Sequence, residues 1–340
     1  MKKEISKLQF LLVGCGTIGE RHAKLASSFG VLQAVCDIIP DRARTFSKLF
    51  QCYGYTSLRE MLKQHPSADA LIVCTPNGMH AAHSIQALKT GLHVLCEKPM
   101  ALSAKDGKKM IAAATKSKRH LMVVKQNRYN PPVRAVKELL KKNKLGRVYS
   151  VQINCFWNRG SSYYTQSNWR GTKKLDGGVL FTQFSHFVDL LYWYFGPLQH
   201  VSGATSNMAH QTISEVEDTG VFQFKTEGGV FGSLHYTTNA ALENYEGSFT
   251  IIAEKATIKV GGPYLNQLEY QKPTIIKNLP VSNRANHYKG YKGSMNNHAQ
   301  VYKDFTDVLF GKKNSYTSGE EAIQSVIMIQ QCYHAAAKSK

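Results

Sequence analysis

The chain has 340 residues, of which 43% are hydrophobic and 19% are charged, as in a globular protein long enough for two domains. No apolar run is long enough to span a bilayer, because the longest, residues 179–198, is interrupted by polar side chains, so we expect no membrane insertion. The net charge of +20 favours an anionic partner, which could be a nucleic acid, an acidic membrane surface or a phosphorylated substrate. The basic residues are scattered along the chain, so most are expected on solvated surfaces.

The seven cysteines are widely spaced, odd in number and free of C-x-x-C pairs, and several lie within apolar runs. This pattern is typical of reduced thiols in a core, so we expect a cytoplasmic protein without a metal site. Residues 1–14 combine a basic start with a short apolar stretch. The stretch is too short for a signal peptide, and we interpret it as the first strand.

A glycine-rich turn follows that strand and precedes a helical pattern. Gly14, Gly16 and Gly19 form G-x-G-x-x-G. In such a turn the first glycine permits a tight bend, the second lets the backbone approach a pyrophosphate, and the third lets the helix pack on the strand. The N–H groups at the helix start, near Thr17 and Ile18, can bind phosphate oxygens. This predicts dinucleotide binding.

A second apolar run ends at Asp37, eighteen residues after Gly19. A carboxylate at this point accepts hydrogen bonds from a ribose and would repel a 2′-phosphate. The sequence therefore favours NAD over NADP, although Arg42 lies close enough to leave the second cofactor open.

Strands and helices continue to alternate up to about residue 128 and predict a doubly wound parallel sheet, in which ligands bind at the carboxyl ends of strands. Two of these ends carry polar turns, Thr75-Pro76-Asn77 and Glu97-Lys98-Pro99. An isolated Glu-Lys-Pro would be read as a simple turn with solvated charges. Here its position places Lys98 beside the expected dinucleotide.

The second half changes to longer segments of alternating polarity joined by tight turns. They predict an α+β domain with a large, mostly antiparallel open sheet. We expect a Rossmann domain over residues 1–128 and a substrate-binding and oligomerisation domain over 129–340. Two terminal helices, at 297–309 and 320–338, can pack back on the first domain.

One predicted helix of this half, within residues 176–196, carries His186 and Asp189, three residues apart on one face. A histidine held by a carboxylate can serve as a general base, whereas the alternative is a buried histidine capped by its neighbour. The segment from Arg159 to Gly171 combines arginines with tyrosine and tryptophan. These side chains could form ordinary core, or they could stack on a sugar or base and pair with phosphates.

Together, "LLVGCGTIGERHA", "VCTPNGMH", "GLHVLCEKPMA" and "LDGGVLFTQFSHFVDLLYW" resemble the Gfo/Idh/MocA family of sugar and cyclitol dehydrogenases over nearly the whole chain. The resemblance implies that Lys98 reaches the substrate near the nicotinamide, that Glu97 and Pro99 shape its turn, and that His186 is the family histidine. Thr182 stands where many members carry aspartate, four residues before that histidine. This departure argues against an inositol-like substrate.

The segments "VVKQNRYNPP", "NCFWNRGSSYYTQSNWRGT" and "VEDTG" are similar to bacterial UDP-N-acetylglucosaminuronic acid 3-dehydrogenases. This narrower resemblance implies NAD-dependent oxidation of the C3 hydroxyl of a UDP-linked sugar uronate, for surface polysaccharide of the lipopolysaccharide O-antigen type. Lys98 or His186 would take the hydroxyl proton, supported by Thr182 and Asp189. The family also implies a homodimer or homotetramer associating through the open sheet.

The residues expected to contact NAD are Gly14, Gly16, Thr17, Ile18, Gly19, Asp37, Arg42, Thr75, Pro76, Asn77, His80, Glu97, Lys98 and Gln126. Those expected to contact the substrate are Lys98, Arg128, Arg159, Tyr164, Trp169, Arg170, Thr182 and His186. Lys125 is a further candidate, and Asn297 and His298 can border the site.

Three alternatives stay open. A dehydrogenase of a free sugar or inositol would be indifferent to the UDP portion. A non-catalytic NAD sensor would not depend on Lys98. Nucleic-acid binding would rest on the charge alone, because no helix-turn-helix, zinc or RNA-binding signature accompanies it.

Overall fold

The computed structural model describes residues 7–288, 291–313 and 316–338. The chain forms two compact units. Unit 1 comprises Met1–Val124 and His298–Ile323, and unit 2 comprises Lys125–Asn297 and Gln324–Lys340. The expected domains at 1–128 and 129–340 stay a prediction. None of the helices in the described ranges is long and apolar enough to cross a membrane.

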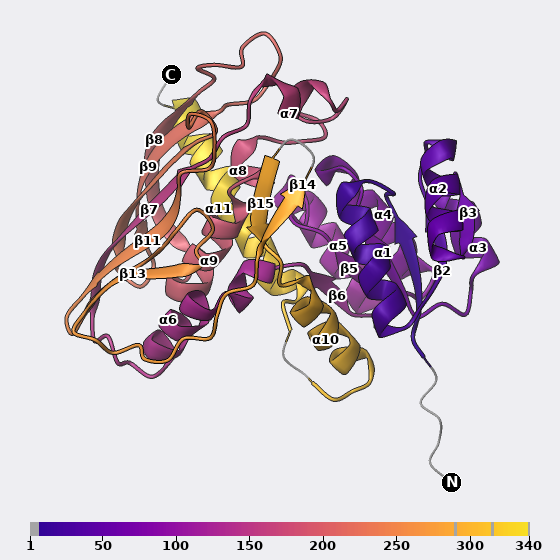
Figure 1. Cartoon of the computed structure of the whole chain (residues 1–340), viewed down its shortest axis with the longest axis horizontal. Coiled ribbons are helices and arrows are strands. Elements are labelled where there is room, and N and C mark those ends of the chain that lie inside the picture. The colour runs from indigo at the N-terminus through magenta and orange to yellow at the C-terminus, as the bar shows by residue number, and fades with distance from the viewer. Residues whose placement is uncertain (1–6, 289–290, 314–315, 339–340) are drawn as a thin grey trace. The chain divides into compact units, whose positions relative to one another are not determined.

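Unit 1 is built on a six-stranded parallel sheet in the order β3-β2-β1-β4-β5-β6 (Figure 1). Its elements are β1 (Gln9–Val13), α1 (Thr17–Phe29), β2 (Val31–Cys36), α2 (Pro40–Phe50), β3 (Tyr53–Tyr55), α3 (Leu58–Gln64), β4 (Ala70–Val73), the 3₁₀ turn η1 (Asn77–Met79), α4 (His80–Lys89), β5 (His93–Cys96), α5 (Ala104–Ser117), β6 (Leu121–Val123) and α10 (His298–Leu309). This confirms the doubly wound parallel sheet predicted from the sequence.

The central strands of unit 1 are apolar and almost completely buried, as expected for parallel strands covered on both faces. Helices α3 and α5 begin where the sequence supplies a side-chain cap. Ser103, for example, accepts a hydrogen bond from the amide of Asp106 at the start of α5. The ring of Tyr302, on α10, lies against Phe10 of β1 and Phe29 of α1, so the late helix completes the core of the first unit.

Unit 2 contains a seven-stranded sheet in the order β13-β12-β11-β7-β10-β9-β8, parallel at β7–β10 and antiparallel elsewhere. Its elements are η2 (Gln126–Tyr129), α6 (Pro131–Lys141), β7 (Val148–Phe156), α7 (Ser161–Thr165), α8 (Val179–Thr182), α9 (Ser185–Phe195), β8 (Leu198–Ser206), β9 (Thr219–Thr226), β10 (Phe231–Thr237), β11 (Glu246–Ala253), β12 (Thr257–Gly261), β13 (Gln267–Lys272) and the hairpin β14 (Ala285–Tyr288) and β15 (Tyr291–Met295). α11 (Gly319–Lys338) begins in unit 1 and ends in unit 2. The large, mostly antiparallel sheet is confirmed.

The buried face of this sheet packs on α9. The ring of Phe187, on α9, stacks on Phe249 of β11, with ring centroids 6.1 Å apart. The opposite face carries exposed apolar residues, including Val221 on β9 and Ile252 on β11. The alternation of buried and exposed residues along β9 is the period-two pattern of a sheet with one covered face.

The helix predicted within residues 176–196 is in fact two helices, α8 and α9, separated at Gln183 and Phe184. The amide of Phe184 bonds to the carbonyl of Val179, five residues earlier, so the α-helical ladder is broken there. The buried side chain of Gln183 accepts a hydrogen bond from Arg159 and donates one to the Tyr163 hydroxyl. These two hydrogen bonds hold the side chain of Gln183 in place at the break between the two helices.

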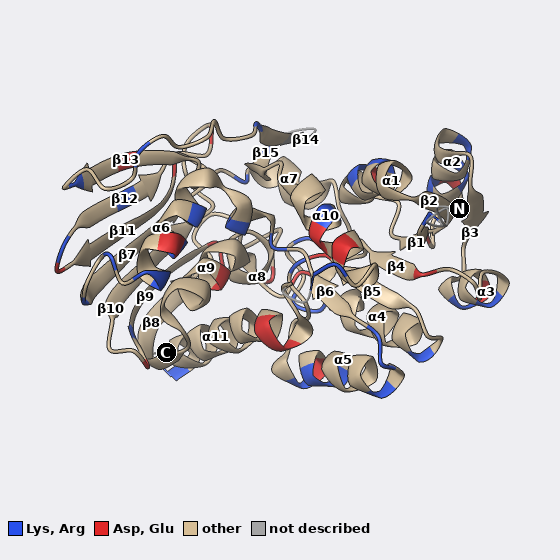
Figure 2. Cartoon of the chain, turned by 90° about the horizontal axis from the view of Figure 1, so that it is seen from below, with Lys and Arg blue, Asp and Glu red and all other residues tan. Residues whose placement is uncertain are grey.

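Lysine and arginine are dispersed over the outer surfaces of several helices in each unit, including α5 and α6 (Figure 2). A few are paired with acids one helical turn away, as Lys109 is with Asp106 and Lys24 with Glu20. The large net charge is therefore a property of the whole surface and not of one basic segment.

Candidate functional site

In the glycine-rich turn between β1 and α1, two of the three glycines have no room for a side chain and the third has open space in front of it. Gly14 has φ of +100°, and a Cβ there would lie 2.5 Å from the carbonyl oxygen of Cys74. A Cβ on Gly19 would lie 2.0 Å from the carbonyl oxygen of Gly14. A Cβ on Gly16 would meet nothing within 4 Å, and no side chain caps the start of α1 at that residue. The turn therefore leaves open space in front of helix N–H groups, which fits a phosphate group.

Asp37 follows β2 and is held by two backbone amides. Its Oδ2 accepts from the N–H of Cys15 at 2.8 Å, and its Oδ1 accepts from the N–H of Ile39 at 2.9 Å. Each carboxylate oxygen keeps a second lone pair for a hydroxyl donor. Together, the open turn and this fixed carboxylate suit the pyrophosphate and ribose of a dinucleotide. Arg42 lies in the first turn of α2.

The two polar turns at the carboxyl ends of β4 and β5 are joined by His80. Its Nδ1 lies 2.7 Å from the carbonyl oxygen of Pro99, and its Nε2 lies 2.8 Å from that of Thr75. Burial lowers the pKa of His80. Asn77, the last residue of the first of these turns, is buried at the start of η1. The structure thus brings together in unit 1 the strand-end residues that the sequence predicted.

Glu97 is buried at the end of β5, directly before the half-buried Lys98. Its Oε2 accepts from the backbone N–H of Lys98 at 3.0 Å, and its Oε1 lies 2.8 Å from Nε2 of His22 and 3.5 Å from Nε2 of His298. Burial alone would raise the pKa of Glu97, but the hydrogen bonds and charges of the two histidines outweigh it and hold the pKa well below its usual range. Sequence reasoning missed His22, whose only local signal is its place one helical turn after Gly19.

In unit 2, His186 is the second residue of α9, and its ring lies beside the side-chain amide of Gln126. Nε2 of Gln126 lies 3.2 Å from Nε2 of His186 and donates to the Ser294 hydroxyl at 3.0 Å. Both hydrogens of the amide nitrogen are used in this orientation, and Oε1 of Gln126 is buried without a partner among the described residues. Sequence reasoning did not anticipate Ser294, on β15.

Asp189 was expected to orient His186, but the structure shows it bound to two cations. Its carboxylate accepts from Arg128 at 2.8 Å and 2.9 Å in a bidentate pair, and Nζ of Lys125 lies 3.1 Å from Oδ1. All three side chains are buried. Burial would raise the pKa of Asp189, and the charges of Arg128 and Lys125 lower it instead, to about 2.

Thr182 is hydrogen-bonded to a carboxylate from the preceding loop. Its hydroxyl donates to Oδ1 of Asp176, whose Oδ2 accepts from the amide of Gly171 at 2.8 Å. Burial raises the pKa of Asp176 to about 6. Glu217 is a second buried acid, which accepts from the Tyr333 hydroxyl at 2.6 Å, and burial raises its pKa to about 7. A carboxylate is therefore present beside Thr182, although position 182 itself lacks one.

The arginine and aromatic segment expected to contact substrate forms one cluster around α7. The guanidinium of Arg170 lies 4.2 Å from the ring centre of Tyr163, and Trp169 is 5.8 Å from the same group. The buried Arg159 lies 5.4 Å from that tyrosine ring on its own cation–π contact. Such stacked guanidinium groups can present N–H donors to phosphate or carboxylate oxygens.

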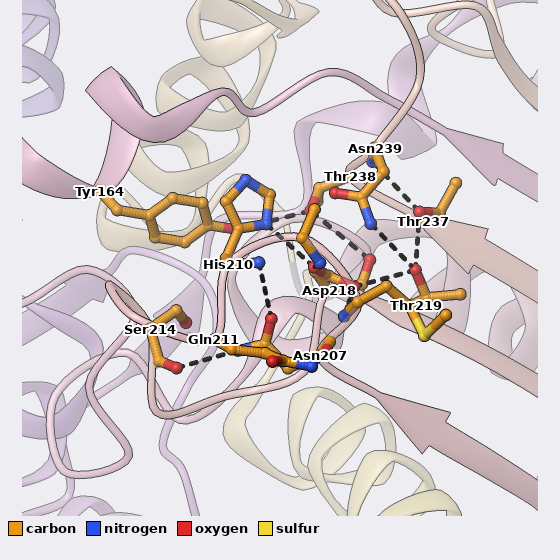
Figure 3. A network of polar contacts seen from close by, with 12 residues as sticks. Tyr164, Asn207, His210, Gln211, Ser214, Asp218, Thr219, Thr237, Thr238 and Asn239 are labelled. Carbon is orange, nitrogen blue, oxygen red and sulfur yellow. Dashed lines mark hydrogen bonds and ion pairs between the residues drawn. The ribbon is translucent and has the colours of Figure 1, made fainter.

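Figure 3 shows a network of polar contacts that lies against Tyr164 of this segment. The ring of Tyr164 lies 4.7 Å from that of His210, whose Nδ1 lies 3.0 Å from the buried carboxylate of Asp218. Asp218 also accepts from two backbone amides of the loop after β8, and Asn207 donates to the carbonyl of Ser214 in the same loop. The predicted substrate residue Tyr164 is thus held against a fixed polar network that the sequence did not reveal.

Two family models match the chain. Residues 8–125 match the Gfo/Idh/MocA oxidoreductase family, described as an NAD-binding Rossmann fold, and residues 133–259 match the Gfo/Idh/MocA C-terminal domain. The two matches together cover most of both predicted domains.

The chain is similar to two solved WlbA dehydrogenases, each in complex with NADH and UDP-GlcNAcA. The Bordetella pertussis structure is 34% identical with a TM-score of 0.87, covering 98% of each chain. The Chromobacterium violaceum structure is 35% identical with a TM-score of 0.89, covering 99% of this chain and 96% of the other. By sequence, the glucose-6-phosphate 3-dehydrogenase of Bacillus subtilis is 29% identical over 62% of this chain and 60% of its own length.

Proposed function

This chain belongs to the Gfo/Idh/MocA family of NAD-dependent sugar oxidoreductases, and from that premise we propose that it oxidises the C3 hydroxyl of a UDP-linked N-acetylamino sugar uronate. The product would serve surface polysaccharide synthesis. The observation that carries the proposal is the likeness to two WlbA dehydrogenases at 34% and 35% identity over nearly the full chain, whose complexes contain UDP-GlcNAcA.

The residues of unit 1 fit NAD. The open turn at Gly16 and the uncapped start of α1 would bind the pyrophosphate, and Asp37 would accept the ribose hydroxyls. When bound, NAD supplies the oxidant, which takes a hydride from the carbinol carbon. The protein then has to position the substrate hydroxyl and remove its proton.

We assign proton removal to Lys98. An alcohol is a weak acid, so its loss of a proton needs a nearby base and a positive field for the developing alkoxide. His186 is the other candidate. In the amide orientation described above, the Nε2 lone pair of His186 accepts a hydrogen of Gln126, so the imidazole then acts as a hydrogen-bond donor through Nδ1.

The substrate carries a diphosphate and a sugar carboxylate, and the cluster around α7 supplies cations suited to them. Arg170, stacked on the ring of Tyr163, would pair with these anionic groups, and Trp169 and Tyr164 would pack on the sugar or base. Arg159 would take a lesser part, because its Nε and Nη1 already donate to Gln183, Asn158 and Asn244. We assign Arg128 a lesser part, since its guanidinium already forms a bidentate pair with Asp189.

We also propose a cytoplasmic location and a homo-oligomer. All seven cysteines are free thiols, which supports a reducing compartment. The exposed apolar residues on the open face of the seven-stranded sheet support association of subunits through that face.

The test is rapid mixing of NAD⁺-loaded protein, at near-stoichiometric concentration, with UDP-N-acetylglucosaminuronic acid, followed by NADH absorbance. UDP-N-acetylglucosamine, free N-acetylglucosamine and inositol serve as substrate controls. Lys98→Ala should abolish the burst while retaining NADH binding, and Lys89→Ala, an exposed lysine on α4, should behave as the unchanged protein.

A burst with the uronate alone supports the proposal. A burst with a free sugar or inositol would keep the family and discard the uronate. No burst with any of these compounds, together with intact NADH binding, would leave the substrate open and favour the sensor alternative. An equal burst in Lys98→Ala would remove Lys98 from the mechanism.

A further inference from the structure

A buried arginine of unit 2 is held by uncharged acceptors. Arg159 follows β7 and is 2% exposed. Its Nε donates to Oε1 of Gln183 at 2.8 Å, and its Nη1 donates to Oδ1 of Asn244 at 3.0 Å and to the carbonyl oxygen of Asn158. Amide and carbonyl oxygens carry no formal charge. These three bonds therefore satisfy N–H donors of the guanidinium without supplying a negative charge.

The orientation of both side-chain amides is fixed by their nitrogens. Nε2 of Gln183 donates to the hydroxyl of Tyr163 at 2.6 Å. Nδ2 of Asn244 donates to the backbone carbonyl oxygen of Lys292 at 3.0 Å. Because a carbonyl oxygen only accepts, the nitrogen of Asn244 must face Lys292, and its oxygen then faces Arg159.

Two aromatic rings and a second arginine lie beside this guanidinium. Its central carbon is 5.2 Å from the ring centre of Trp157 and 5.4 Å from that of Tyr163. The guanidinium of Arg170 is 4.2 Å from the same tyrosine ring. The two positive groups lie within 10 Å of each other, because their distances from that ring together come to less than 10 Å. Aromatic faces attract cations but carry no net charge.

Pairing with an acid is the usual way to bury a guanidinium, because a buried cation without a counter-charge is costly. Glutamate has nearly the shape of glutamine, and aspartate nearly that of asparagine. An acid at position 183 or 244 could therefore bond to Arg159 and also cancel its charge. The chain has an amide at both positions, which favours a role for the charge itself.

We propose that Arg159 is a specificity-determining residue whose positive field attracts the carboxylate of the sugar, so that the protein prefers a uronate to the corresponding neutral sugar. Gln183, which holds the guanidinium, directly follows Thr182 and precedes His186 by three residues. The charge is thus anchored at the segment proposed to contact the reacting sugar. The half-buried Arg170 supplies the direct contact. This inference rests on the proposed function, in its choice of a uronate as substrate.

A purely structural role for Arg159 makes the opposite prediction. Its side chain joins the end of β7 to the break between α8 and α9 and to the loop before β11. An acidic partner would strengthen such a link, because hydrogen bonds between a guanidinium and a carboxylate are stronger than those to an amide. Adding a negative charge beside the arginine, with little change of shape, therefore separates the two roles.

Gln183→Glu places a carboxylate against Nε of Arg159, and a carboxylate beside a guanidinium stays ionised. Gln183→Met is the matched control, because it removes the hydrogen bonds of the amide but adds no charge. Calorimetry measures the binding of UDP-N-acetylglucosaminuronic acid and of UDP-N-acetylglucosamine to NADH-loaded protein. The ratio of the two dissociation constants gives the preference for the uronate.

The expected change in that preference follows from the distance over which the charge acts. At an effective dielectric constant of about 20, cancelling a charge roughly 8–10 Å from the carboxylate should reduce the preference on the order of tenfold. Gln183→Met should leave the preference unchanged, whatever its effect on stability.

Arg159→Lys and Arg159→Met form a second pair, which guards against failure of the variants at position 183 to fold. Lysine keeps the positive charge and should retain the preference for the uronate. Methionine removes the charge and should lose the preference to a similar extent as Gln183→Glu.

Loss of the preference in Gln183→Glu and Arg159→Met, with retention in Gln183→Met and Arg159→Lys, supports the inference. Unchanged or tighter binding of the uronate by Gln183→Glu would overturn it in favour of the structural role. Equal weakening of both nucleotide sugars would also overturn it, because the charge would then act on the diphosphate that they share. If the uronate binds with this preference but is not oxidised in the rapid-mixing experiment, the proposed reaction fails and the role of Arg159 stands.

Discussion

Replacing Asp189 by asparagine tests whether the buried ion cluster of unit 2 is held by its single anion. The change preserves shape but leaves Arg128 and Lys125 buried without their carboxylate. Breaking a buried ion pair by removing one partner typically costs about 3–5 kcal/mol.

The lowered pKa of Asp189 gives an independent estimate. A shift from 3.8 to about 2 corresponds to about 2 kcal/mol of stability. Because the folded pKa is depressed, this contribution is present above pH 4 and is lost as the pH falls towards 2. At pH 7, Asp189→Asn should therefore lower the free energy of unfolding by about 2–5 kcal/mol.

Lys125→Met is the matched control, because it removes the contacts of Lys125 with Asp189 and with the Ser325 hydroxyl but leaves Arg128 and Asp189 as a neutral pair. Its cost should be about 1–2 kcal/mol. The assay is urea unfolding followed by tryptophan fluorescence, since all three tryptophans lie in unit 2. If Lys125→Met proved as destabilising as Asp189→Asn, the charge argument would be wrong.

Three further predictions concern the other described groups. Because the pKa of Glu217 is raised to about 7, its stabilising contribution is present at low pH and is lost as the pH rises through 7. The melting temperature should therefore fall between pH 5 and 8. Glu217→Gln should reduce that fall. Asp37→Ser should weaken NADH binding about 10- to 100-fold by fluorescence titration and reduce discrimination against NADPH; unchanged affinity would remove Asp37 from the ribose site. Gly16→Ala should leave the melting temperature unchanged, because its Cβ meets open space, but should weaken NADH binding by calorimetry; equal binding would mean that no ligand approaches Gly16.

The parts of the fold that were predictable have local signals. β1, β4 and β5 are continuous apolar runs, and the glycines of the first turn occur at the spacing that close backbone contacts require. β8 and β13 have no comparable local signal, because they are the edges of the seven-stranded sheet. Edge strands expose polar residues and carry little hydrophobic alternation.

The candidate site was predictable where it follows a strand end and unpredictable where it depends on long-range pairing. Lys98 and Asp37 could be found from their position after apolar runs. The pairing of Glu97 with His22 and His298 could not, because the two histidines lie 75 residues before and about 200 residues after Glu97 and look like ordinary histidines in sequence. Likewise, Asp189 sits one turn from His186, but its strongest partners, two cations, precede it by about sixty residues.

The return of α10 to the first sheet has a consequence for biosynthesis. Tyr302 covers Phe10 and Phe29 across about 280 residues of intervening sequence, and Val123 donates its amide hydrogen to the carbonyl of Thr317. The ribosome therefore has to release most of the polypeptide before the nucleotide-binding sheet can close. Until then the aromatic rings of β1 and α1 are uncovered, and a fragment ending near residue 124 would keep them so. We expect chaperones to bind the nascent chain during this interval, and we expect truncated products to be the species that aggregate.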